Sequence, residues 1–136
     1  MSPPAMPFLP LRRVLRAAAM AWLVLAGSAQ ANGWVGYGES ESGTFYFDPA
    51  SVQSKGQRHR VWRLFELKQP RADGVQSGKA WIEFDCQAST YRYLRTLYFA
   101  GRQGQGKYLG GAQAQPEEPI GPGSMIGLLS QKICPR

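Results

Sequence analysis

Hydrophobic and polar residues alternate with a period of two along much of the chain after residue 33, a pattern typical of β-strands. The clearest example is the segment Lys79–Cys86, in which Ala80, Ile82 and Phe84 are separated by charged residues and a tryptophan. One face of this segment is expected to be buried. A tight connection leads to a second strand at Thr90–Ala100, so we expect the two segments to form an antiparallel hairpin.

Four further segments are predicted to be strands because they are rich in aromatic or β-branched residues and end at turn sequences. They are Trp34–Tyr37, Thr44–Phe47, Arg58–Lys68 and a brief strand around Lys107–Leu109. The polar, glycine-rich or proline-containing segments between them are expected to be turns, connectors or loops: Gly38–Gly43, Asp48-Pro49, Ala50–Gly56, Arg71–Ser77 and Gly101–Gly111. The predicted sheet therefore has about six strands.

An amphipathic helix is predicted near the C-terminus, after the linker Pro116–Gly123. Ser124 can cap its first turn, and Pro135 prevents it from continuing. The periodic positions, spaced i, i+3, i+4 and i+7, are Met125, Leu128, Leu129 and Lys132. We expect this helix to cover one face of the sheet; a membrane-binding helix is the alternative.

The two longest predicted strands carry large apolar residues on both of their faces. Alternation places Val61, Phe65 and Leu67 against Trp62 and Leu64 in one strand, and Tyr91, Tyr93, Leu97 and Phe99 against Leu94 and Tyr98 in the other. A sheet with one solvated face shows polar residues on that face. If the helix covers one face, a loop or a partner must cover the other.

Composition limits the class of protein. The chain has 136 residues, enough for one domain, and its 43% hydrophobic content is too high for a disordered chain. Its 16 glycines and 10 prolines follow no triplet period, which excludes a collagen-like rod. One histidine and two cysteines cannot build a closed four-ligand zinc site. No metal and no cofactor are predicted.

The first 31 residues have the pattern of a secretory signal peptide. Three arginines precede an apolar run of ten residues, Ala17–Ala26, and a small-x-small site ends at Ala31. The run would rise only about 15 Å as a helix, half of a bilayer's hydrocarbon core, so it is too short for a membrane span. Cleavage after Ala31 would leave a domain of residues 32–136 with no membrane span.

Two details refine the prediction of export. Leu25-Ala26-Gly27 is followed by Ser28 rather than cysteine, so no thiol is available there for a lipid anchor. The pair Arg12-Arg13 suggests twin-arginine export, but Arg16 lies where an apolar residue is usual, and general secretion is favoured. Periplasm, cell surface and medium all remain open as destinations.

Charge points to acidic rather than nucleic-acid partners. The formal net charge of +7 falls to +4 when the three arginines of the signal peptide are removed. This excess suits attraction to lipopolysaccharide or sulfated glycans. Nucleic-acid binding usually needs denser basic clusters, so no nucleic acid is expected.

The two cysteines, Cys86 and Cys134, are expected to form one disulfide in an oxidising compartment. Closing a loop of this length contributes about 4 kcal/mol in the chain-entropy model. A reactive dithiol is the alternative, but the C-x-x-C spacing is absent.

Two of the strands combine cationic and aromatic residues. The candidate binding residues, offered as a hypothesis, are Arg58, His59, Arg60, Trp62, Tyr91, Arg92, Tyr93 and Arg95. Arginine and tyrosine are enriched at binding hot spots. In the structural alternative, Tyr91 and Tyr93 fill the core while Arg92 points to water. His59 is expected at the surface, with contact to an anion or a haem as its functional alternative.

No strong catalytic motif is present. A small basic ribonuclease would need residue types that His59, Arg92, Arg95 and either Glu66 or Glu83 supply, but their spacing matches no known signature. Gly104-x-Gly106 lacks the strand–loop–helix context of a phosphate-binding loop. No catalytic residue is predicted.

The order of these segments resembles the surface-adhesin protein E family of Gram-negative bacteria. The resemblance covers Trp34–Cys134 and rests on motifs in a fixed order: Trp34, Phe45-Tyr46-Phe47-Asp48, Ser51-Val52, Val61-Trp62, Trp81-Ile82-Glu83-Phe84-Asp85-Cys86, Tyr98, Ile120-Gly121-Pro122-Gly123-Ser124 and Ile133-Cys134. It implies an α+β domain, with an antiparallel sheet of about six strands and a helix near the C-terminus.

The resemblance also implies a non-enzymatic binding protein. A well-known member is an outer-membrane lipoprotein that adheres to host matrix proteins and can dimerise. The present chain departs from it at Ser28, where a lipoprotein has cysteine. The sequence therefore favours an exported binding module that adheres to host or matrix macromolecules. The runner-up is a soluble periplasmic protein that binds a small ligand or an anionic envelope polymer, and a secreted hydrolase or ribonuclease ranks third.

Overall fold

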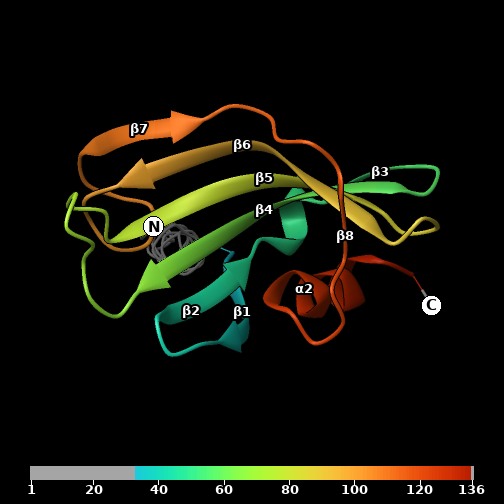
Figure 1. Ribbon diagram of the computed structural model, residues 1–136, viewed down its shortest axis with the longest axis horizontal. Helices are drawn as coiled ribbons and strands as arrows, with labels where there is room; N and C mark the ends of the chain where they lie inside the picture. Colours follow the sequence, from blue (N-terminus) through green and yellow to red (C-terminus); the bar gives the residue numbers. More distant parts are fainter. Residues whose placement is uncertain (1–32, 136) are drawn as a thin grey trace, which may run out of the picture. The chain divides into compact units, whose positions relative to one another are not determined.

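An eight-stranded antiparallel sheet forms the framework of the protein (Figure 1). The computed structural model describes residues 33–135, so the predicted signal peptide and its cleavage site lie outside the described residues. The strands are β1 (Val35–Glu39), β2 (Gly43–Phe47), β3 (Gln53–Lys55), β4 (Arg58–Leu67), β5 (Ser77–Asp85), β6 (Thr90–Phe99), β7 (Tyr108–Ala112) and β8 (Glu118–Pro119). The main order is β1-β2-β4-β5-β6-β7, with β3 on β4 and β8 on β6.

The six strands of the main order correspond to the six predicted from the sequence, and the β5–β6 hairpin is confirmed. The two additional strands lie in segments interpreted as a connector and a linker. All three residues of β3 are exposed, and β8 has only two residues, so neither shows an alternation that could reveal it. A short 3-10 helix, η1 (Pro49–Ser51), precedes β3.

The helix α2 (Met125–Ile133) packs on one face of the sheet, here called the helix face. It begins at Ser124, whose Oγ accepts a hydrogen bond from the backbone N–H of Gly127 at 3.0 Å, as predicted. Its buried side chains Ile126, Leu129 and Ile133 join a core that includes Val61, Ala80, Ile82 and Phe84. No helix among the described residues is long and apolar enough to cross a membrane.

The buried stripe of α2 is rotated from the predicted one. Met125 and Leu128 are only partly buried, and they lie against Gly38 of β1. A Cβ atom at Gly38 would come within 2.7 Å of the Met125 sulfur. The helix therefore fits over the edge strand as well as over the centre of the sheet, which the spacing of its own residues could not reveal.

The disulfide between Cys86 and Cys134 is confirmed. It joins the end of β5 to the end of α2, and so holds the helix against the strand that provides much of the core. A loop that separates its ends by 48 residues contributes about 4 kcal/mol in the chain-entropy model.

A β-bulge in β6 changes which side chains share a face. Trp81 pairs with Arg95 and Ile82 with Tyr93, so Leu94 is the extra residue. An inserted residue reverses the alternation beyond it. The expectation that Leu97 and Phe99 share a face with Tyr93 was therefore wrong: the register places both on the opposite face.

A loop covers one end of the face opposite the helix, as the two-sided apolar pattern required. Ser77 Oγ donates to the Gly101 carbonyl at 2.6 Å and accepts from the Gly104 N–H at 2.8 Å. Gly104 has φ +68°, which L side chains rarely adopt, and an added Cβ would displace the Lys79 side chain. The loop predicted at Gly101–Gly111 is thus held on the sheet by hydrogen bonds, while the arginine-bearing part of this face is left open to solvent.

Candidate functional site

Strand alternation divides the predicted binding residues between the two faces. Cross-strand pairing places Arg58, Arg60, Trp62, Arg92 and Arg95 on the face opposite the helix, and His59, Tyr91 and Tyr93 on the helix face. The structure therefore brings together five of the eight predicted residues. These four arginines and one tryptophan come from β4 and β6, which flank β5, so their side chains can act as one surface.

A buried carboxylate organises these arginines. The Glu83 side chain is 3% exposed, and its Oε1 accepts hydrogen bonds from Arg58 Nη1 at 2.9 Å and Arg92 Nε at 3.1 Å. Its Oε2 accepts from Arg60 Nε at 2.8 Å. The sequence identified Glu83 only as a candidate ribonuclease acid. Its position in an alternating strand placed it on this face, but register was needed to show its three partners.

Electrostatics keep Glu83 ionised. Burial acts to raise the pKa of its carboxyl, but the hydrogen bonds from Arg60 and Arg58 and the charge of Arg92 outweigh burial. The pKa of Glu83 therefore lies below its ordinary value of 4.5. Three guanidinium groups around one carboxylate leave a net positive charge at the cluster. The Asp85 carboxylate, 3.6 Å from the Arg58 guanidinium, partly offsets this charge.

An aromatic pair adjoins the charged cluster. The rings of Trp62 and Trp81 lie with their centroids 5.3 Å apart, and Arg95 is the cross-strand partner of Trp81. We call this surface the arginine–tryptophan face; its residues are Arg58, Arg60, Trp62, Trp81, Glu83, Arg92 and Arg95. Trp81 had not been selected from the sequence, although its place beside Glu83 in the same alternating strand was a usable signal.

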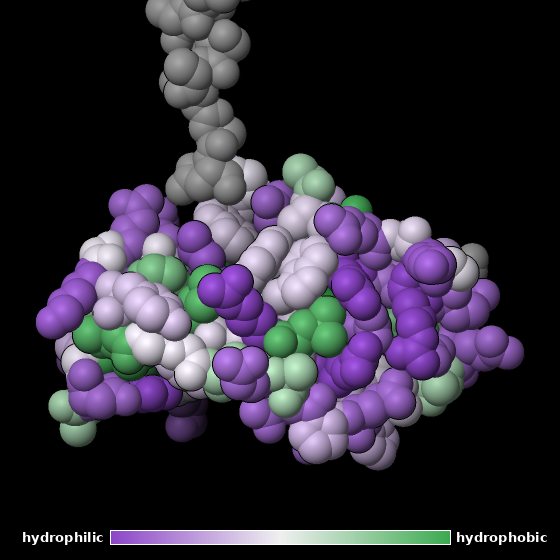
Figure 2. All heavy atoms as spheres, turned by 90° about the horizontal axis from the view of Figure 1, so that it is seen from above, coloured by the Kyte–Doolittle hydropathy of each residue, from purple (hydrophilic) through white to green (hydrophobic). Residues whose placement is uncertain are grey.

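A pocket of about 370 Å³ opens where this face meets β3. It is lined by Gln53, Ser54, Lys55, Arg58, Arg60 and Glu83. Figure 2 shows that the end of the sheet that carries β3 is mostly hydrophilic. A ligand at this pocket would therefore meet cationic and hydrogen-bonding groups rather than an apolar surface.

The arginines retain donors for a partner. Arg58, Arg60 and Arg92 have side chains that are 49%, 44% and 39% exposed, and each uses only part of its five N–H groups on Glu83. Pairing with a buried carboxylate restricts their rotamers before any partner arrives. The surface can therefore bind anionic oxygens and stack flat groups on the tryptophans.

His59 was expected at the surface, and this expectation was wrong. It is 8% exposed on the helix face, opposite Phe84, because β4 alternation turns it toward the core. Its Nδ1 lies 2.6 Å from Ser54 Oγ, and its buried Nε2 has no hydrogen-bond partner among the described residues. Glu66 and Glu83 lie on the other face, so the ribonuclease arrangement is not assembled.

Tyr91 and Tyr93 lie on the helix face and pack against the core. Their rings meet edge to face at 5.8 Å, and the Tyr91 hydroxyl donates to Glu118 at 3.1 Å. This is the structural alternative considered from the sequence. Arg92, between them, lies on the opposite face with Glu83. Within residues 33–135 no group of three or more His, Cys, Asp or Glu side chains could hold a metal ion.

Comparison with known proteins gives a family and a fold. The model of the family described as surface-adhesin protein E matches residues 34–135. A structure of Haemophilus influenzae protein E is similar with a TM-score of 0.61 and 13% identity, covering 77% of this chain and 86% of that chain. A second crystal form gives a TM-score of 0.60 and 14% identity, covering 77% and 89%. At such identity these structures show the fold alone. No curated protein sequence matches the chain.

Proposed function

This chain belongs to the surface-adhesin protein E family, and on that premise we propose that it is an exported, non-enzymatic binding protein that adheres to anionic host or matrix macromolecules. The observation that carries the proposal is the arginine–tryptophan face. There, one buried carboxylate holds three half-exposed arginines beside a tryptophan pair.

The chemistry of this face fits a macromolecular partner. Arginine and tryptophan are the residue types most enriched at interface hot spots. The Glu83 carboxylate orders the arginines in advance, which lowers the entropy lost when a partner binds. Cationic side chains outnumber carboxylates at this face. The cations are Lys55, Arg58, Arg60, Arg92 and Arg95, and the carboxylates are Glu83, Asp85 and Glu117. The excess of positive charge favours sulfated or carboxylated partners.

Membership of a family of surface adhesins implies export, and the Cys86–Cys134 disulfide suits an oxidising compartment. Adhesion further requires that the arginine–tryptophan face be reachable from outside the cell. A location test therefore comes first. Cells that produce a C-terminally tagged protein are fractionated, and intact cells are treated with protease. We expect the tag to be degraded or found in the medium.

Binding is then measured with heparin as a sulfated glycan probe on a biosensor surface. We expect wild-type binding that weakens as salt rises, and at least a fivefold loss in Arg60→Gln. The matched control is Arg102→Gln, which removes a 67% exposed arginine remote from Glu83 and should bind as the wild type does. Equal losses in the two variants would mean that net charge alone drives binding. A tag protected in the periplasm would oppose adhesion and favour the role of an envelope-ligand binder.

A further inference from the structure

Another arginine of the sheet is buried, and no carboxylate among the described residues pairs with it. Arg63 in β4 is 8% exposed, and its Nη1 donates to the Tyr93 hydroxyl at 3.0 Å. Its Nε has no hydrogen-bond partner in the part of the chain that the structure describes. None of the ion pairs among residues 33–135 includes Arg63. A guanidinium group is always protonated, so this is a buried positive charge with no negative partner.

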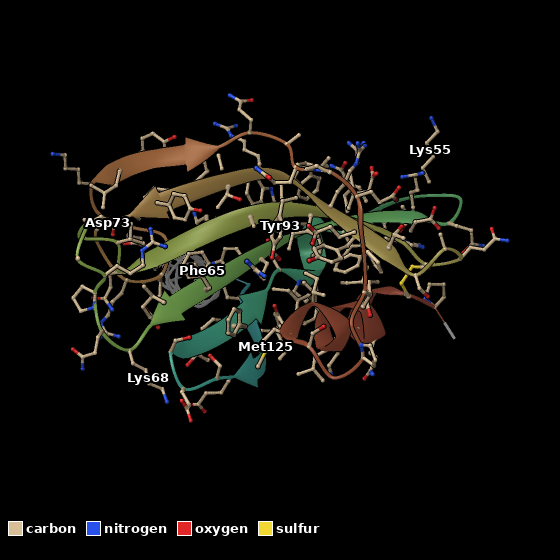
Figure 3. All side chains as sticks on the ribbon, viewed as in Figure 1. Lys55, Phe65, Lys68, Asp73, Tyr93 and Met125 are labelled. Carbon is tan, nitrogen blue, oxygen red and sulfur yellow. A yellow bond between two sulfur atoms is a disulfide. The ribbon has the colours of Figure 1, made fainter. Side chains whose placement is uncertain are left out.

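Aromatic rings surround this charge. The Arg63 guanidinium carbon lies 5.2 Å from the ring centroid of Tyr93, 5.6 Å from that of Phe45 and 5.9 Å from that of Phe65. Phe65 and Tyr93, labelled in Figure 3, come from β4 and β6, the two strands that flank β5. Cation–π contacts offset part of the cost of burial, but the rings provide no full negative charge and no acceptor for Nε.

Tyr37 does not provide that negative charge either. Burial raises the pKa of its hydroxyl to about 12, although the nearby Arg63 acts to lower it. The hydroxyl is therefore neutral at physiological pH, and it has no hydrogen-bond partner among residues 33–135. An anion that paired with Arg63 would therefore come from outside the described part of the chain.

Arg63 opens onto a pocket of about 270 Å³ on the helix face. The lining includes Phe65, Arg71, Tyr93, Tyr98 and Gln115. Arg71 is a second cation: it lies 5.3 Å above the Tyr98 ring and pairs with the exposed Asp73 at 2.7 Å. The pocket thus combines one buried unpaired guanidinium, one exposed guanidinium and flat aromatic walls. Its volume suits a small molecule or a single side chain.

We propose that this pocket binds a small aromatic carboxylic acid, whose carboxylate pairs with Arg63 and whose ring packs among the aromatic side chains. A guanidinium group matches a carboxylate in a two-point contact, and the aromatic lining of Phe65, Tyr93 and Tyr98 suits a flat ring attached to that carboxylate. The site lies on the opposite face of the sheet from the arginine–tryptophan face, so it is independent of the proposed adhesion.

The first test uses the folded wild-type protein. The Nε–H resonance of Arg63 is followed in a ¹H–¹⁵N spectrum while sodium benzoate is added at constant ionic strength. We expect a saturable shift of this resonance and of the Tyr93 and Tyr98 amides. Benzamide, a neutral molecule of the same shape, should leave the Arg63 resonance in place. No shift with benzoate, an equal shift with benzamide, or a shift with inorganic phosphate only would overturn the proposal.

Variants then assign the binding energy. Arg63→Met should abolish the saturable response, and Arg71→Gln, a surface change, should weaken benzoate binding at least threefold. Arg102→Gln, which removes an arginine from another loop, should bind benzoate as the wild type does. If Arg63→Met fails to fold, the Arg71→Gln comparison still decides: unchanged affinity there would contradict the two-cation site.

Discussion

Arginine side chains on the two sides of strand β4 lie in opposite environments. On one side, Arg58 and Arg60 are about half exposed and share the buried carboxylate of Glu83 with Arg92. On the other side, three residues after Arg60, Arg63 is buried among aromatic rings, and no carboxylate among the described residues pairs with it. The first group carries its own counter-ion, whereas the second lacks one.

This difference separates two kinds of binding surface. A cluster that is internally neutralised in part, yet open to solvent, is suited to large anionic partners that need no enclosed site. A buried unpaired cation is costly, and a ligand that supplies the missing negative charge would offset that cost. The same residue type therefore points to a macromolecular interface on one face and to a small-molecule pocket on the other.

The largest effect is expected from removing the shared counter-ion. Glu83→Leu leaves three arginines repelling one another around an apolar side chain, and we expect a loss of about 3 kcal/mol in the free energy of unfolding. Urea denaturation measures it. Asp85→Asn is the control. The Asp85 carboxylate contacts only Arg58 among the arginines, and the amide oxygen of an asparagine can still accept hydrogen bonds from the backbone N–H groups of Gln87 and Ala88. A loss of less than 1 kcal/mol in Glu83→Leu would contradict the role of Glu83.

The second effect concerns the aromatic surroundings of Arg63 at high pH. The Tyr37 pKa is raised from 10.0 to about 12 in the folded state, so the unfolded chain loses this proton first. Stability should therefore be intact below pH 10 and fall by about 2–3 kcal/mol as the pH rises to 12. Tyr37→Phe should remove that part of the decline. Thermal melts of the wild type and Tyr37→Phe between pH 9 and pH 12 measure this decline. An identical decline of stability with pH in the two proteins would count against a buried neutral hydroxyl at Tyr37.

A third effect concerns acid. The pKa of Glu83 is lowered in the folded state from its ordinary value of 4.5. The ionised carboxylate therefore contributes to the free energy of unfolding above pH 4.5, and this contribution is lost as the pH falls through the folded-state pKa. The wild type should lose stability steadily in this window. Glu83→Gln should start from a lower stability at pH 7 and decline less, and a parallel decline in both proteins would show that other carboxyls dominate.

The smallest effect is expected from Arg63→Met without ligand. Methionine fills similar space, and removing the guanidinium leaves no carboxylate unpaired among the described residues. The free energy of unfolding should therefore change by no more than about 1 kcal/mol. Urea denaturation again measures it. A loss above about 3 kcal/mol would mean that the aromatic surroundings need the guanidinium for folding, and that the comparison between the two faces fails.

Local sequence pattern explains the central strands, the Ser124 cap and the cysteine pair, because each depends on neighbours in the chain or on the compartment. It could not locate β3, whose residues are all exposed and pair only because β2 leaves that part of β4 free. The bulge at Leu94 also escaped prediction, since alternation gives a period but not where an extra residue interrupts it.

Much the same limit applies to the candidate sites. Alternation placed Arg58, Arg60 and Trp62 together, but the convergence of three arginines on Glu83 depends on the register of three strands. His59 was misplaced because flanking arginines suggested solvent, although they lie on the other face. The sequence does carry one signal for Arg63, because alternation places this charged residue between the apolar Val61 and Phe65 on one face of the strand.

The most direct test of the account is a crossed binding measurement on two single variants. Arg92→Gln and Arg71→Gln are each titrated with heparin and with benzoate at matched ionic strength. The account predicts that Arg92→Gln loses heparin binding and keeps benzoate binding, while Arg71→Gln does the reverse. If both variants lose both ligands, or neither variant loses either, the two faces do not have separate binding roles and the account is contradicted.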